Sequence, residues 1–154
     1  MRDLFAFEQD GRYPLRRIPM IMRFKLDACG IRLPLIAWAL LSREQRERLV
    51  DLPYASEHDR QQFQEEIVQM LAPHADNPDA AIELVPVDQQ PIWRDLTLVP
   101  RQVCDQLEEL TLPPLTVDQW RSLNELQRFA LTKLTRSGHK NANLLPALRE
   151  FGLA

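Results

Sequence analysis

The sequence predicts an all-α protein: a helical bundle of about six helices, arranged as two pseudo-equivalent three-helix repeats. Three observations lead to this prediction. Apolar residues recur at helical spacing behind strong capping residues. The hydrophobic share of 45% and the charged share of 27% are those of an ordinary globular protein. The two halves of the chain also share a residue pattern at a nearly constant offset, as repeated units do.

The chain divides into segments that we expect to form one compact domain. They are an extended N-terminal arm at 1–17, repeat one at 18–72, a proline-rich connector at 73–98 and repeat two at 99–154. Gly11 and Pro14 interrupt any helix in the arm. The connector contains four prolines, and its apolar residues 82–85 predict one short strand.

Repeat one begins with a helix that runs from Pro19 to about Cys29. Proline suits the first helical position, because the N–H that it lacks would have no partner there. Gly30 follows the helix and favours the left-handed turn that ends it. An apolar helical turn is expected at 33–41.

The later helices are predicted from their capping residues. Ser42 and Gln45 form a capping box for a helix that ends near Leu52. Ser56 caps the next helix, which Pro73 ends. The elements expected in repeat two are a helix from Pro100 to about Leu110, a turn capped by Thr116 and Gln119, a helix from Asn124 to Leu134 and a last helix ending at Phe151.

The pattern that the two halves share includes rare residue types. At an offset of 82, the residues Trp38, Leu41, Ser42, Gln45, Arg46 and Leu49 correspond to Trp120, Leu123, Asn124, Gln127, Arg128 and Leu131. We expect Trp38 and Trp120 to be buried at a contact between the repeats. Arg46 and Arg128 are expected to have structural roles, in ion pairs with residues such as Asp27 or Glu150.

Charge is unevenly distributed along the chain. Residues 1–34 hold seven Lys/Arg and four Asp/Glu, residues 35–110 hold six and fifteen, and residues 111–154 hold six and three, so the net charges are +3, −9 and +3. Opposed patches suit a protein partner better than nucleic acid, which favours one dominant basic face. The longest uncharged apolar run, 33–41, is far shorter than the roughly 20 residues of a membrane-spanning helix. A charged N-terminus does not resemble a signal peptide, so we expect a cytoplasmic protein without membrane contact.

No pattern of catalytic or metal-binding residues stands out. Cys29 and Cys104 are too few for a disulfide framework or a zinc site, and neither HExxH nor a glycine-rich phosphate loop is present. Cys29 is interpreted as a small, partly buried structural residue. The histidines His58, His74 and His139 are interpreted as loop or helix-end residues. We therefore expect no metal, no cofactor and no enzymatic activity. A small enzyme of unknown reaction is the alternative, and it would need convergent polar groups in a pocket.

Several short motifs resemble one known family. They are Leu15-Arg16-Arg17-Ile18-Pro19-Met20, Lys25-Leu26-Asp27, Cys29-Gly30-Ile31, Leu49-Val50 with Leu52-Pro53, and Pro146-Ala147-Leu148 with Glu150-Phe151-Gly152. Together they resemble the nitrate reductase-associated protein family of cyanobacteria and proteobacteria. The resemblance covers nearly the whole chain outside the connector.

The resemblance implies an accessory role for an assimilatory nitrate reductase, beside whose genes members of the family tend to be encoded. It supplies no catalytic residues to carry over. Cyanobacterial members have a cysteine directly before Ile-Pro, where this sequence has Arg17. A paired-cysteine role for Cys29 is therefore in doubt.

The candidate partner-binding residues fall into two basic clusters and one apolar segment. They are Arg16, Arg17, Arg23 and Lys25; Lys133, Arg136, His139 and Lys140; and Ile36 and Leu40. The clusters would dock an acidic partner, here a nitrate reductase polypeptide, or an anionic molybdopterin cofactor; the alternative is ordinary solvated surface. Residues 36–41 are apolar all round, so they are either completely buried or partly exposed as an interface. We expect a non-catalytic accessory protein, with a regulatory adaptor for another client as the alternative.

Overall fold

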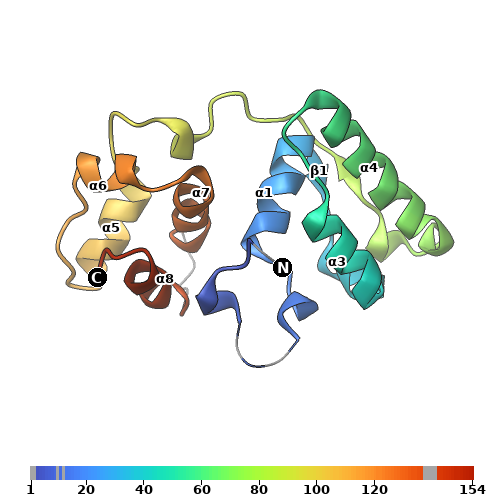
Figure 1. Cartoon of the computed structure of the whole chain (residues 1–154), viewed down its shortest axis with the longest axis horizontal. Coiled ribbons are helices and arrows are strands. Elements are labelled where there is room, and N and C mark those ends of the chain that lie inside the picture. The colour runs from blue at the N-terminus through green and yellow to red at the C-terminus, as the bar shows by residue number, and fades with distance from the viewer. Residues whose placement is uncertain (1–2, 10, 12, 137–141) are drawn as a thin grey trace. The chain divides into compact units, whose positions relative to one another are not determined.

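A computed structural model describes residues 3–9, 11, 13–136 and 142–154. The protein is mostly helical (Figure 1). The described residues contain eight α-helices. They are α1 (Met20–Cys29), α2 (Leu35–Leu40), α3 (Arg43–Asp51), α4 (Glu57–Leu71), α5 (Arg101–Glu109), α6 (Val117–Ser122), α7 (Glu125–Leu134) and α8 (Leu144–Glu150). The predicted number of about six was too low, because the two segments read as turns, α2 and α6, each form a helix of six residues.

The chain folds as two compact units. Unit 1 comprises Met1–Leu4 and Glu8–Asp88, and unit 2 comprises Phe5–Phe7 and Gln89–Ala154. In unit 1 the helices α1, α3 and α4 contact one another, and in unit 2 α7 contacts both α5 and α8. The residues predicted as a connector are divided between the two units at Asp88 and Gln89.

Short elements account for much of the remaining chain. The single-turn 3-10 helices are η1 (Ala6–Glu8), η2 (Pro14–Arg16), η3 (Ala72–His74), η4 (Pro78–Ala80) and η5 (Ile92–Arg94). The strand predicted at 82–85 is present as β2 (Glu83–Leu84). It pairs antiparallel with β1 (Ile31–Arg32), which was not predicted.

Helix starts follow the predicted capping residues closely. Gln45 donates its backbone N–H to the Ser42 hydroxyl at 3.1 Å, and its side chain accepts from the Ser42 N–H at 2.9 Å. Thr116 with Gln119 forms the same reciprocal pair at the start of α6. Pro19 lies one position before the first residue of α1, in extended conformation, rather than inside the helix.

Lys25 is the largest departure from the predicted surface. Its side chain is only 2% exposed, although a lysine in a helix is usually solvated. The ammonium donates to the carbonyls of Leu49, Val50 and Leu52, and so it caps the C-terminal end of α3. Burial lowers the pKa of Lys25, while the nearby carboxylates of Asp3 and Asp51 oppose that shift.

The two predicted tryptophans have closely similar surroundings. Both side chains are completely buried. The indole N–H of Trp38 donates to the Leu15 carbonyl at 2.9 Å, and that of Trp120 donates to the Asp95 carbonyl at 3.0 Å. Each partner lies within the same unit as its tryptophan. Their placement at a contact between repeats stays a prediction.

Arg46 and Arg128 do not form the predicted ion pairs with Asp27 or Glu150. Both guanidinium groups donate to backbone carbonyls: Arg46 to those of Leu15, Trp38 and Ala39, and Arg128 to those of Trp93 and Leu123. The Glu150 carboxylate accepts instead from the backbone N–H groups of Ala6 and Phe7. A guanidinium offers five donors, which suits it to bind several carbonyls at once.

Candidate partner-binding surface

One edge of α2 is apolar and exposed. Ala37 and Trp38 are completely buried, whereas Leu35, Ile36 and Leu40 are 64%, 48% and 37% exposed. Complete burial, one of the two alternatives considered for this segment, is therefore wrong. Ile36 and Leu40 are four residues apart and so lie on one face of the helix. The resulting edge is a candidate contact surface, because exposed apolar side chains that cluster often mark interfaces.

The Arg46 guanidinium holds the end of α2 against the segment that precedes α1. Its Nη1 donates to the Leu15 carbonyl at 3.3 Å, its Nη2 to the Ala39 carbonyl at 3.1 Å and its Nε to the Trp38 carbonyl at 3.1 Å. Because one planar group binds all three carbonyls, η2 and the C-terminal end of α2 must lie side by side.

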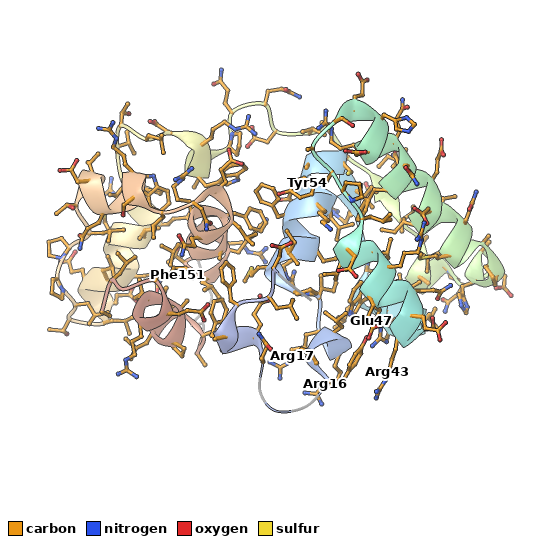
Figure 2. The ribbon with its side chains drawn as sticks, in the orientation of Figure 1. Arg16, Arg17, Arg43, Glu47, Tyr54 and Phe151 are labelled. Carbon is orange, nitrogen blue, oxygen red and sulfur yellow. The ribbon has the colours of Figure 1, made fainter. Side chains whose placement is uncertain are left out.

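Exposed arginines border this junction. Arg16 and Arg17 follow Leu15 directly, and Arg43 begins α3 three residues after Leu40, the last residue of α2. All three side chains are exposed, and no described carboxylate forms an ion pair with any of them. Figure 2 labels all three in the lower part of the view, below Glu47. We call Leu35, Ile36 and Leu40 together with Arg16, Arg17 and Arg43 the α2 surface.

Tyr13 fixes the position of Arg43 within the α2 surface. The Arg43 guanidinium lies over the Tyr13 ring at 4.4 Å from its centroid, and the Tyr13 hydroxyl donates to the Arg43 carbonyl at 3.4 Å. Burial and the Glu47 carboxylate raise the pKa of Tyr13, against the opposing effect of Arg46 and Arg43. The phenol is therefore neutral near pH 7 and can act as a hydrogen-bond donor.

The other predicted basic residues lie elsewhere. Lys25 is buried and cannot contribute to a basic surface. Arg23 is exposed on α1, where its Nε donates to the Ile18 carbonyl at 3.3 Å. Lys133 and Arg136 belong to unit 2, and the Lys133 ammonium lies over the Phe129 ring at 5.3 Å. His139 and Lys140 lie outside the described residues.

Sequence reasoning found part of this surface and missed the rest. Arg16, Arg17, Ile36 and Leu40 were predicted, whereas Leu35, Arg43 and Tyr13 were not. The contribution of Arg43 and Tyr13 depends on the contact between η2 and α3, which are separated by about 30 residues, whereas Leu35 adjoins Ile36 in the same helix. The one local signal was Pro14 directly after Tyr13, because proline favours a fixed turn there.

Other parts of the described chain offer little chemistry. Burial raises the pKa of the Cys29 thiol to about 11, although Arg60 and Lys25 oppose that shift, so the thiolate that a nucleophile needs is scarce near pH 7. Among the described residues, no group of three or more His, Cys, Asp or Glu could hold a metal ion. No described helix has the length and apolar character needed to cross a membrane.

Fold and surface together define a mostly helical protein with an exposed apolar helix edge bordered by arginines. Comparison with known families places it more closely. Residues 4–151 match the family described as conserved nitrate reductase-associated protein, and the chain belongs to that family. No curated protein matches the sequence, and no solved structure does.

Proposed function

We propose that this protein is a non-catalytic accessory protein that binds a nitrate reductase polypeptide in the cytoplasm and assists its maturation or activity. The observation that carries the proposal is the family match over residues 4–151, because the family is described by its association with nitrate reductase. The α2 surface supports a binding role, since it combines exposed apolar and cationic side chains.

We also propose that the two halves are pseudo-equivalent repeats, each of four helices. Matching environments support this proposal. Each buried tryptophan donates to a backbone carbonyl in the segment that leads into the first helix of its half, and a proline directly precedes that helix. Each arginine binds backbone carbonyls. Superposition of residues 18–72 on 99–151 tests this. The helices should align in order, with Trp38 over Trp120 and Arg46 over Arg128.

Deletion of the gene in its native host tests the accessory role. We expect nitrate reductase activity in extracts to fall, and a plasmid copy of the gene to restore it. A tagged copy should also co-purify the nitrate reductase polypeptide. Full activity in the deletion strain would contradict the accessory role, and absence of the polypeptide from the purified material would contradict direct binding.

A further inference from the structure

We propose that the α2 surface binds an acidic amphipathic helix of a protein partner, with the apolar face of that helix on Leu35, Ile36 and Leu40 and its carboxylates against Arg16 and Arg17. This inference deepens the proposed function, and where the partner is nitrate reductase it rests on that function.

The exposed edge of α2 has the shape and spacing to pack against another helix. Ala37 and Trp38 on the inner face of α2 are buried in the core of unit 1. Leu35, Ile36 and Leu40 remain exposed to solvent and are available to a partner. Ile36 and Leu40 are four residues apart, which is the spacing at which the apolar side chains of a second helix recur. Removing such an edge from water favours association through the hydrophobic effect.

The exposed arginines beside this edge favour an acidic partner. Arg16, Arg17 and Arg43 are exposed, and no described carboxylate forms an ion pair with any of them. Glu44 and Glu47 share α3 with Arg43 and weaken the field on that side. Carboxylates of a partner should therefore lie nearer Arg16 and Arg17, whose guanidinium groups can bind them through two hydrogen bonds each.

The chain contains a matched surface that lacks this combination. Val68 on α4 is 49% exposed, almost the same as Ile36 at 48%. Its sequence neighbourhood is acidic, with Glu65 and Glu66 close by in the same helix. If exposure of an aliphatic side chain were enough for binding, Val68 and Ile36 would behave alike, and their comparison isolates the contribution of the α2 surface.

The first experiment uses designed peptides of about 18 residues, or five helical turns. One has a leucine face flanked by glutamates, and the other has the same face flanked by lysines. We expect the glutamate peptide to shift the backbone amide NMR signals of residues 15–17 and 35–43, and to bind at least about tenfold more tightly than the lysine peptide. Equal binding of both peptides, or shifts confined to other residues, would overturn the inference, whatever the role in nitrate reduction.

The second experiment uses single variants and the nitrate reductase polypeptide from the same host. Ile36→Asp should abolish co-purification, and Val68→Asp should leave it unchanged, with circular dichroism confirming that both variants fold. If the wild-type protein binds and Ile36→Asp binds equally well, the α2 surface is not the contact, although the proposed function stands. If the wild-type protein fails to bind nitrate reductase while the glutamate peptide binds the α2 surface, the proposed partner is wrong and the surface assignment stands.

Discussion

Both the backbone conformation and the space around it require glycine at position 30. Its φ of +67° lies in the left-handed region, which side chains with a Cβ rarely adopt. A Cβ added there would also lie 2.5 Å from the Val85 carbonyl oxygen. The Val85 N–H donates to the Gly30 carbonyl at 2.8 Å, so this close approach is part of the junction between α1 and the β1–β2 pair.

We expect Gly30→Ala to destabilise the protein more than the equivalent change at Gly152. Gly152 has a similar φ of +75°, but an added Cβ would meet nothing within 4 Å. Gly152→Ala should cost about 1–2 kcal/mol from backbone strain alone. Gly30→Ala should cost roughly 1–3 kcal/mol more, because the new methyl group is overpacked. Urea denaturation of both variants measures the difference, and equal losses would show that the Val85 contact gives way easily.

Cys29 allows a test of electrostatics at a single atom. Its thiol has a pKa of about 11, compared with an ordinary value of 9.0, because burial disfavours the thiolate. Since the folded state holds this proton more tightly than the unfolded state, the contribution to stability is present below pH 9 and is lost as the pH rises towards 11.

The rate at which iodoacetamide alkylates Cys29 reports this pKa directly. In the Cys104→Ala variant Cys29 is the only thiol, and its alkylation rate should rise with a midpoint near pH 11. Circular dichroism across the same range confirms that the fold persists. A midpoint at or below pH 9 would mean that the thiol is more accessible to water than its surroundings indicate.

At the scale of elements, each tryptophan holds one short helix in its unit. Trp38 belongs to α2 and Trp120 to α6, both of only six residues, and helices this short are unstable alone. Trp38→Ala and Trp120→Ala should each cost ~3–5 kcal/mol, as large aromatic deletions in a core do. Trp93→Ala serves as the control, because that side chain is only half-buried and should cost less. Unchanged denaturation midpoints in the first two variants would contradict a core role.

The elements also show what could be predicted from sequence. Caps such as Ser42 with Gln45 were predictable, because they depend on residues three positions apart. The β1–β2 pair joins residues about 50 positions apart, and β1 has only two residues, so no local pattern indicates it. Lys25 looked like a surface residue for the same reason: the carbonyls that it binds lie on another helix, and nothing in its own helix indicates them.

The residues of the candidate surface also differ in whether local sequence could predict them. Arg16, Arg17, Ile36 and Leu40 could be proposed from charge and apolar runs alone. Whether residues 36–41 are buried or exposed could not be decided, because that depends on which face of α2 Trp38 anchors. Arg43 belongs to the surface through the contact between η2 and α3, where its guanidinium lies over the Tyr13 ring.

At the scale of the whole molecule, the N-terminal segment has an unexpected connectivity. Phe5–Phe7 belongs to unit 2, although the residues on both sides of it belong to unit 1. The Phe5 ring lies 5.1 Å from that of Phe151, and the Glu150 carboxylate accepts from the N–H groups of Ala6 at 3.0 Å and Phe7 at 2.9 Å. The next residue, Glu8, accepts instead from the Met20 N–H at 2.7 Å, within unit 1. Adjacent residues thus stabilise different units.

This arrangement predicts that the start of the chain stabilises its last helix. Replacing Phe5 and Phe7 by alanine removes the ring contacts to Phe151, which should cost α8 about 1–3 kcal/mol, since aromatic pairs contribute roughly 0.5–1.5 kcal/mol each beyond their burial. Hydrogen exchange read by mass spectrometry should then be faster in Leu144–Glu150, by roughly tenfold for every 1.4 kcal/mol lost, with α1 little affected. The control, Glu8→Gln, removes a charged acceptor one residue away and should speed exchange at the start of α1 while leaving α8 protected. If the phenylalanine variant leaves exchange in α8 unchanged, the segment is held by the chain on either side of it and contributes nothing to unit 2.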